Sequence, residues 1–537
     1  MPGWNFADTW EAIADAIPDA QALVHGDRRT SWAEFDQRGD GVAAWLLDLG
    51  VSHQDKVAHY LYNCSEFLES MFGILKVACV PVNTNYRYAD EELLYLWDNA
   101  DAVAVVFHGA FADRIETLRH KLPNVRGWLW VDDGSGPCPE WATPYEQAAG
   151  SRPGRQRAPW GRDGDDIYML YTGGTTGMPK GVMWRQDDIF FTLNAAAMGV
   201  RHPDEPDYDS VRANVTAPGM VALPACPLMH GTGAFTSFGV LDTGGSIVTL
   251  EGRTFEADEF LDAVQREKVN AVAIVGDAFA KPILRALDAN PGKWDLSSLV
   301  AITSSGVMWS EETKQGLLKH HPGMILADAF SSSEALGMGT SVSTAGGTTS
   351  TAKFALGETT RVITEDGRDV VPGSEEVGRV ALKGRGRVPL GYYKDEEKSA
   401  RTFLVIDGER YSIPGDYATV DADGTLRILG RGSVCINTGG EKVYPEEVEE
   451  VLKTHVSVRD AVVVGVPDEK WGEAITAMVE AHPGAALDEA ELIGHVKARL
   501  AAYKAPKRVL PVDTVGRAPN GKVDYKRLKD EAIARVG

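Results

Sequence analysis

One glycine-rich stretch, residues 171–181, constrains the fold and the chemistry of this chain more than any other feature. It holds four glycines, three threonines and Lys180, in the order Tyr-Thr-Gly-Gly-Thr-Thr-Gly-Met-Pro-Lys-Gly. Glycines allow successive backbone N–H groups to point into one concavity, where they bind an anion. Threonine hydroxyls add donors, and the lysine adds a positive charge. The stretch therefore predicts a polyphosphate-binding loop that follows a strand.

The Walker loop of P-loop NTPases is the main alternative for such a stretch, and its pattern is not met. Met178 and Pro179 precede Lys180 here, and Gly181 stands where a Walker loop has Ser or Thr. A Walker lysine also lies at the start of a helix, whereas residues 181–184 predict an extended chain. The alternative without a function is a glycine-rich surface turn.

Length, charge and cysteine content indicate a multi-domain enzyme of a reducing compartment. A chain of 537 residues is too long for one hydrophobic core and divides into at least two domains. The net charge of −23 at pH 7 argues against nucleic acid or an anionic membrane as the main partner, so a bound nucleotide needs a local cationic site. The cysteines show no metal-ligand spacing, which indicates free thiols and no zinc site. They are Cys64, Cys79, Cys138, Cys226 and Cys435.

Neither a secretion signal nor a membrane-spanning segment is predicted. Residues 1–10 lack the basic and apolar regions of a signal peptide, and no apolar run is long enough to cross a bilayer. The expected location is therefore cytoplasmic. Peripheral contact with a membrane and the oligomeric state, a homodimer included, are left open.

Alternating strand-like and helix-like segments in the first half predict an α/β fold. Ser31 and Glu34 form the pattern of a helix N-terminus. Residues 57–61 and 77–82 predict strands, and residues 66–76 predict the helix between them. Such βαβ units predict largely parallel sheets with helices on both faces.

The pattern changes after Gly430 to a compact α+β unit. We therefore expect a large N-terminal domain of layered sheets and helices, residues 1–429, and a small mobile α+β C-terminal domain, residues 430–537. Within the first domain, residues 132–166 are rich in Gly, Pro and charge and predict a connecting surface segment. Residues 203–219 also predict irregular structure.

The glycine-rich loop resembles the phosphate loop of the adenylate-forming superfamily, which includes acyl-CoA synthetases, adenylation domains and luciferases. The resemblance runs from about Thr30 to Lys526, with further motifs in the same order. It implies that the chain binds ATP, and it places these residues at the nucleotide: Thr172, Gly173, Gly174, Thr175, Thr176, Gly177, Lys180, Ser305, Gly306, Phe330, Ser333, Asp416 and Arg431.

Residues 330–334, Phe-Ser-Ser-Ser-Glu, resemble the segment that places an aromatic ring on adenine, a hydroxyl on phosphate and a glutamate on Mg²⁺. The family pattern is Tyr-Gly-x-Thr-Glu, so Phe330, Ser331 and Ser333 depart from it. Mg²⁺ needs few protein oxygens when a triphosphate supplies the others, so Glu334 alone suffices as the metal ligand. Taken without a nucleotide, the serines and the glutamate predict the cap of a helix.

Asp416 resembles the aspartate that holds both ribose hydroxyls in this family, although a proline replaces the usual Thr or Ser before the preceding glycine. Arg431 resembles the arginine that contacts ribose and phosphates. The same motif implies a hinge at Ser433, where the family usually has Asp or Lys. Gly439 and Gly440 resemble the loop that lines the tunnel for coenzyme A (CoA).

Lys522 resembles the lysine that bridges the attacking carboxylate and the α-phosphate, where an ammonium offsets the repulsion between two anions. His230 resembles the histidine near the entrance for the acyl carboxylate, although a lone histidine beside apolar residues is as often part of the core. The resemblance thus implies Lys522, Glu334 and His230 as catalytic residues. For the acyl substrate it implies His230, Gly231, Val275, Gly276 and Asp277.

The motifs together identify the chain as a member of the AMP-forming acyl-CoA synthetases, and residues 180–184 and 432–437 resemble those of actinobacterial ligases for fatty acids and steroid side-chain acids. The resemblance implies that a carboxylic acid and Mg·ATP give an acyl-adenylate, from which CoA takes the acyl group. One alternative is a fatty-acyl-AMP ligase that loads a carrier protein. Another is an inactive nucleotide-binding or scaffold protein, and the presence of Lys522, Glu334 and Asp416 argues against it.

Overall fold

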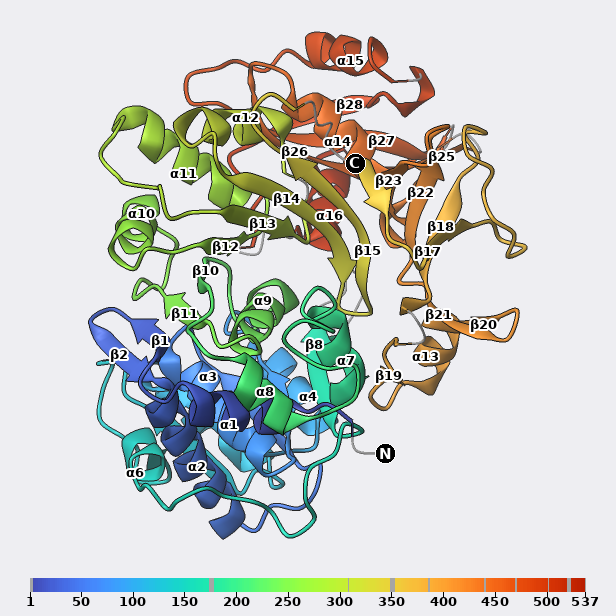
Figure 1. Ribbon diagram of the computed structural model, residues 1–537. Helices are drawn as coiled ribbons and strands as arrows, with labels where there is room; N and C mark the ends of the chain where they lie inside the picture. Colours follow the sequence, from blue (N-terminus) through green and yellow to red (C-terminus); the bar gives the residue numbers. More distant parts are fainter. Residues whose placement is uncertain are drawn as a thin grey trace.

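The computed structural model of the protein describes residues 3–172, 178–307, 309–347, 353–384, 387–438, 441–468, 471–500, 502–518 and 523–536. Within these residues the strands form three sheets, with helices between and around them (Figure 1). The N-terminal helices lie at the bottom of Figure 1 in blue, and the C-terminal unit lies at the top in red.

The first sheet has 15 strands and combines a parallel half with an antiparallel half. From β1 to β14 in spatial order, neighbouring strands pair in parallel. Antiparallel pairing begins with the β14–β15 hairpin. In spatial order the strands are β2 (Arg28–Ser31), β1 (Gln21–His25), β11 (Ser246–Thr249), β10 (Val221–Pro224), β12 (Ala271–Ile274), β13 (Ala301–Ser305), β14 (Ile325–Ser332), β15 (Ala335–Ser343), β16 (Lys353–Leu356), β23 (Leu426–Arg431), β22 (Asp416–Val420), β18 (Gly378–Leu382), β21 (Glu409–Ser412) and β20 (Phe403–Ile406), with β17 (Thr360–Ile363) paired to β18.

The second sheet has eight strands and is parallel except at one edge. The antiparallel edge is formed by β9, which pairs with β8 on one side and with β19 on the other. In spatial order the strands are β19 (Gly391–Tyr392), β9 (Lys180–Arg185), β8 (Ile167–Thr172), β4 (Val80–Asn83), β3 (Lys56–Tyr60), β5 (Ala102–His108), β6 (Gly127–Val131) and β7 (Thr143–Pro144).

Helices cover both faces of the parallel strands. In β5, Ala104 and Val106 face the core between the two sheets, whereas Val105 and Phe107 face a separate outer core. This alternation is the period of two that a strand buried on both faces requires. The predicted α/β class is confirmed. The core between the sheets is filled by α1 (Phe6–Ala16), α2 (Trp32–Asp48), α3 (Ser65–Lys76), α7 (Gln186–Leu193) and α9 (Gly231–Leu241); the outer faces carry α10 (Ala257–Arg266), α11 (Asp277–Ala289) and α12 (Glu311–His320) on the first sheet and α4 (Asp90–Asn99) and α5 (Ala112–Leu118) on the second.

The predicted βαβ unit is present as β3, α3 and β4. Helix α2 before it begins where predicted, because the Ser31 hydroxyl accepts a hydrogen bond from the N–H of Glu34 at 3.2 Å and so satisfies a first-turn donor. Strand β4 begins at Val80 and not at residue 77. The intervening residues close the end of α3, where Ala78 has a φ of 51° and Cys79 N–H donates to the carbonyl of Ile74.

One predicted irregular segment, residues 203–219, contains helix α8 (Tyr208–Asn214), so that prediction was wrong over these residues. Asp207 is the N-cap, and its carboxylate accepts from the N–H groups of Asp209 at 3.1 Å and Ser210 at 3.2 Å. Only Val211 of this helix is fully buried, so the segment has no apolar periodicity. The predicted connecting segment 132–166 is largely irregular, with the short helix α6 (Tyr145–Ala149) inside it.

The C-terminal unit is built on the third sheet. A long antiparallel hairpin, β26 with β27, has one apolar core on each face. Its strands are β25 (Glu441–Val443), β24 (Ile436–Thr438), β27 (Gly472–Ala481), β26 (Val458–Asp468) and β28 (Arg508–Val512), and its helices are α14 (Pro445–Lys453), α15 (Glu489–Lys497) and α16 (Tyr525–Val536). The first sheet ends at Arg431 and the third begins at Ile436; the predicted boundary between 429 and 430 stays a prediction. Across the described residues, no helix is both long and apolar enough to span a membrane.

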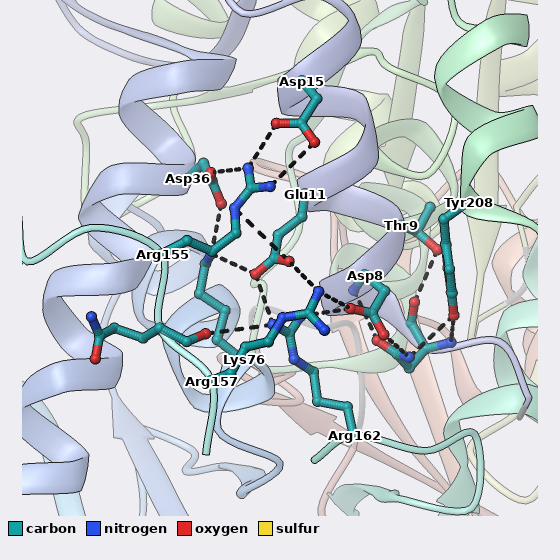
Figure 2. Close-up of polar contacts among 12 residues, drawn as sticks. Asp8, Thr9, Glu11, Asp15, Asp36, Lys76, Arg155, Arg157, Arg162 and Tyr208 are labelled. Atoms are coloured by element: carbon teal, nitrogen blue, oxygen red, sulfur yellow. Dashed lines mark hydrogen bonds and ion pairs between the residues drawn. The ribbon is translucent and has the colours of Figure 1, made fainter. Parts of the chain in front are cut away.

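A buried lysine joins the three N-terminal helices. The ammonium of Lys76, at the end of α3 and with 0% of its side chain exposed, lies 2.9 Å from Glu11 of α1, 2.6 Å from Asp36 of α2 and 2.9 Å from Asp40 of α2. These carboxylates are close enough to surround a cation, and the lysine is that cation. Arg162 donates to Glu11 at 2.9 Å from the segment after α6 (Figure 2).

The charges of this cluster compensate one another inside the protein. Burial alone would raise the pKa of Glu11, but Lys76 and Arg162 hold it below its usual value. Arg155 also joins α1 and α2 through ion pairs, since its guanidinium lies 2.7 Å from Asp36 of α2 and 2.9 Å from Asp15 of α1. Figure 2 shows both arginines reaching the acidic side chains of α1 and α2 from outside the helices.

We expect Lys76→Met to lower the free energy of unfolding by about 3–5 kcal/mol, because it leaves three buried carboxylates without their central cation. Urea denaturation followed by tryptophan fluorescence measures the change. Lys268→Met is the control, since Lys268 pairs with Asp295 at 3.2 Å on the surface and should contribute less than about 1 kcal/mol. Equal losses in the two variants would contradict the role of the cluster.

Candidate active site

The predicted phosphate loop lies in a hairpin at the edge of the second sheet. β8 ends at Thr172 and β9 begins at Lys180, and these two residues are paired across the antiparallel ladder. Gly181 fits closely there, because a Cβ at this position would lie 2.7 Å from the sulfur of Met169. The loop residues between the strands, 173–177, lie outside the described residues.

Asn83, at the end of β4, ties this hairpin to the segment that carries His230. Its amide nitrogen donates to the carbonyl of Tyr171 at 2.8 Å and to the carbonyl of Met229 at 2.7 Å. Its amide oxygen accepts from the N–H of Tyr171 at 2.6 Å. One side chain thus fixes the strand before the phosphate loop and the residue before His230.

The predicted acid-binding segments lie at the starts of two helices. His230 is half-buried at the N-cap position of α9. Gly231 opens that helix, and a Cβ there would lie 3.1 Å from the ring of Phe235 and 3.3 Å from Leu170, so glycine allows the close packing. Gly276 precedes α11 with a φ of 56°, a conformation that glycine adopts without strain.

Residues 275–277 and the predicted adenine turn lie next to each other. The N–H of Gly276 donates to the hydroxyl of Ser304 at 2.9 Å, one residue before Ser305. Gly306 follows with a φ of 92°, and a Cβ on it would lie 3.9 Å from a methyl group of Val275. Asp277 accepts from the N–H and the hydroxyl of Ser310, at 3.2 and 3.0 Å. The Asp277 carboxylate therefore holds the loop before α12.

Residues 330–334 form the tip of the β14–β15 hairpin, and no helix begins there. Ser332 pairs with Ala335, so Ser333 and Glu334 are the two turn residues. The alternative expectation of a helix cap is therefore wrong. Serine side chains hydrogen-bond to nearby backbone groups both in a turn and at the start of a helix. Here the pairing of β14 with β15 selects the turn. The Phe330 ring lies 5.6 Å from that of Phe354, on the side of the antiparallel strands.

The hairpin tip is held by donors from other strands. The indole N–H of Trp184 in β9 donates to the carbonyl of Ser333 at 2.9 Å. The Tyr392 hydroxyl donates to Oε1 of Glu334 at 2.8 Å, and the Ser412 hydroxyl donates to the Glu334 carbonyl at 2.6 Å. Glu334 is buried with 8% exposure. A carboxylate fixed in this way fits a single-glutamate Mg²⁺ site, since the described residues make no hydrogen bond to its second oxygen.

Asp416 and Arg431 face each other at one end of the β22–β23 hairpin. Their side chains form an ion pair, with 3.3 Å between Oδ1 and Nε. Burial raises the pKa of Asp416 against the opposing effect of Arg431, and Asp416 raises the pKa of Arg431. Among the residues that the structure describes, no hydrogen-bond partner is found for the second oxygen, Oδ2, which is buried. A buried acceptor of this kind fits a pair of ribose hydroxyls, which would satisfy it.

Lys180 is held by a residue that the sequence did not single out. Its ammonium forms an ion pair with Oδ2 of Asp395 and lies 5.9 Å from the centre of the Tyr392 ring. Lys180 lowers the pKa of Asp395 through this contact. Residues 391–395, Gly-Tyr-Tyr-Lys-Asp, form a turn before helix α13 (Glu396–Thr402). The only sequence signal for this turn was a pair of aromatic residues between a glycine and a helix-capping aspartate.

Contacts link most of the predicted site residues in one region. The hairpin of Thr172 and Lys180 is tied to the His230 segment through Asn83, and to Glu334 through Tyr392. Ser305 pairs with Ala329 next to Phe330. Like the predicted loop residues 173–177, the predicted residues Gly439, Gly440 and Lys522 lie outside the described residues.

Comparison with known proteins gives consistent matches over the whole chain. The profile of the family described as AMP-binding enzyme matches residues 10–393, and that of the AMP-binding enzyme C-terminal domain matches residues 447–522. A Mycobacterium marinum protein named medium/long-chain-fatty-acid–CoA/3-oxocholest-4-en-26-oate–CoA ligase is 42% identical, covering 99% of this chain and 97% of its own. A 3-oxocholest-4-en-26-oate–CoA ligase from Rhodococcus rhodochrous is 40% identical, covering 99% and 96%.

Solved structures share the fold. An anthranilate CoA ligase in complex with anthranoyl-AMP superposes with a TM-score of 0.84 at 22% identity, covering 100% of this chain and 98% of that chain. ATP-bound MatB from Rhodopseudomonas palustris gives a TM-score of 0.81 at 24% identity, covering 99% and 100%.

We expect Asp416→Asn to weaken ATP binding about tenfold or more, because a hydrogen bond to a charged group contributes about 1.5–3 kcal/mol. Isothermal titration calorimetry measures the dissociation constant. Asp421→Asn is the matched control: Asp421 lies at the other end of the same hairpin and pairs with Lys353 at 2.8 Å on the surface. The same ATP affinity in both variants would show that Asp416 does not hold the ribose.

Proposed function

The chain belongs to the AMP-binding enzyme family, and we propose that it is an acyl-CoA ligase for medium- or long-chain fatty acids or steroid side-chain acids. The names of relatives that are 40–42% identical over nearly the full length support this substrate class. Because all of those relatives are named as CoA ligases, they favour CoA over a carrier protein as the acyl acceptor.

The observation that carries the proposal is the buried Oδ2 of Asp416 beside Arg431, an oxygen that has no hydrogen-bond partner within the described part of the chain. A buried acceptor without a partner is costly, and a protein retains one where a ligand completes it. In this arrangement Asp416 accepts from the ribose hydroxyls, while Arg431 stays on the same face to contact phosphate. Ser305, at the end of β13, pairs with Ala329 of β14 next to Phe330, so the two segments assigned to adenine are adjacent.

In the first half-reaction an acid oxygen bonds to the α-phosphorus of ATP, and the bond to the pyrophosphate oxygen breaks. Lys180 and the phosphate loop would hold the triphosphate, and Glu334 would hold Mg²⁺, which when bound supplies charge compensation for the phosphates. The resemblance assigns to Lys522 the ammonium that bridges the carboxylate and the α-phosphate. We assign His230 and Gly231, at the start of α9, and residues 275–277, at the start of α11, to the acid.

In the second half-reaction the CoA sulfur attacks the acyl carbon, the bond to AMP breaks and the thiol proton is released. We expect the C-terminal unit, residues 430–537, to rotate between the two half-reactions about Ser433. That residue lies in a short 3-10 turn, Gly432–Val434, between the first and third sheets, where backbone angles can change. Gly439 and Gly440 then line the path of CoA. The enzyme acts in the cytoplasm, and a homodimer is compatible with this scheme.

The test of the proposal is the release of AMP and pyrophosphate from Mg·ATP, with and without CoA. The acids range from acetate through long-chain fatty acids to steroid side-chain acids. We expect AMP release to require CoA and to be fastest with one of the two proposed acid classes. Adenylate formation without any response to CoA would indicate a ligase for a carrier protein. No turnover with any acid would contradict the proposal.

Lys522→Ala should reduce adenylate formation by about 10²-fold or more, as expected for loss of one charged group that stabilises a transition state. It should leave thioester formation from synthetic acyl-adenylate close to the wild-type rate. Pyrophosphate exchange and thioester formation are the two measurements. Lys526→Ala, on the exposed face of α16, is the control. Equal loss of both half-reactions in Lys522→Ala would remove the assigned role.

A further inference from the structure

The turn at residues 391–395 is fixed to the strand that follows the phosphate loop. β19 pairs with β9, and the N–H groups of Leu390 and Tyr393 donate to the carbonyls of Met183 and Gly181, each at 2.8 Å. β9 begins with Lys180. The position of this turn relative to the lysine is therefore set by backbone hydrogen bonds on both sides of Tyr392.

Two side chains of this turn reach the two charged groups assigned to the triphosphate and its metal. The Tyr392 hydroxyl donates to Oε1 of Glu334 at 2.8 Å, and the Asp395 carboxylate pairs with the ammonium of Lys180. The turn thus connects a cation and an anion that come from different sheets.

The turn is also rigid within itself. The Ser399 hydroxyl accepts from the N–H of Tyr392 at 2.8 Å and donates to the carbonyl of Asp395 at 2.6 Å. The other carboxylate oxygen of Asp395, Oδ1, caps α13 by accepting from the N–H of Lys398 at 3.0 Å. Asp395 therefore has two functions that can be separated, because asparagine caps a helix as well as aspartate but carries no charge.

A purely structural role explains only part of this arrangement. The Tyr392 ring packs in the core against Phe403, with 5.7 Å between ring centres, and phenylalanine would fill the same space. The hydroxyl, however, is bonded to the carboxylate of Glu334. Likewise, the Asp395 cap does not require the ion pair with Lys180.

We propose that the turn at residues 391–395 positions the ATP site. Tyr392 orients the Glu334 carboxylate for the metal, and Asp395 holds Lys180 until a triphosphate displaces it. A lysine ammonium paired with one carboxylate exchanges it for a triphosphate, because the triphosphate carries more negative charge. Asp395 thus competes with ATP, whereas Tyr392 assists it. The inference rests on the proposed function, since Glu334 and Lys180 take their roles from it.

The proposed roles of Tyr392 and Asp395 predict that substituting them changes ATP binding in opposite directions. Tyr392→Phe should raise the Mg²⁺ concentration needed for half-maximal ATP binding about tenfold, and should leave metal-free ATP binding in EDTA unchanged. Asp395→Asn should tighten ATP binding about threefold to tenfold with and without Mg²⁺, because Lys180 no longer has to leave a partner. Calorimetry with ATP measures both, so the readout does not depend on turnover.

The neighbouring tyrosine provides the matched control. Tyr393 donates its hydroxyl to Asp101 at 2.7 Å, and Tyr393→Phe should leave the Mg²⁺ dependence of ATP binding as in the wild type. Equal effects of Tyr392→Phe with Mg²⁺ and with EDTA would overturn the positioning of Glu334. Weaker ATP binding in Asp395→Asn would overturn the competition for Lys180. A wild-type protein that binds no ATP would overturn the proposed function and this inference together.

Discussion

The buried ammonium of Lys76 is the interaction on which the rest of the molecule depends, because it holds together the helical layer between the two large sheets. Glu11, Asp36 and Asp40 bring α1 and α2 to the end of α3, and these helices set how far apart the sheets lie. The candidate site is assembled from both sheets, with Lys180 on one and Glu334 on the other. The buried ion cluster therefore helps to hold in place the two sheets that carry the charged groups of the site.

Local patterns predicted the elements that are determined by nearby residues. The Ser31 cap, the βαβ unit and the strand pair around the phosphate loop follow from capping, periodicity and glycine content. The hairpin at residues 330–334 could not be predicted, because the same serines cap a helix or close a turn and only pairing between β14 and β15 selects the turn. Asn83 and Tyr392 were missed for a related reason. Their partners, at Met229 and Glu334, are far away in the sequence and are brought close by the fold.

The charge distribution explains how an acidic protein can present a site for a polyanion. Each of the three carboxylates discussed above has its own partner: Asp416 has Arg431, Asp395 has Lys180, and Glu334 has the hydroxyl of Tyr392. The region therefore does not hold a simple excess of positive charge. The local cationic site expected for a nucleotide thus arises when the ligand binds. Oxygen atoms of the ligand then replace protein oxygens as partners of cations that stay in place.

Asn83 uses both ends of its amide on two backbone segments, the strand before the phosphate loop and the residue before His230. The strand cannot move away from the acid-binding segment without breaking hydrogen bonds on the same side chain. If the proposed nucleotide displaces this strand, the displacement would therefore reach the segment proposed for the acid. Such a linkage would couple the binding of the two proposed substrates, and thermodynamic reciprocity would then require the acid to alter the affinity for nucleotide by the same factor.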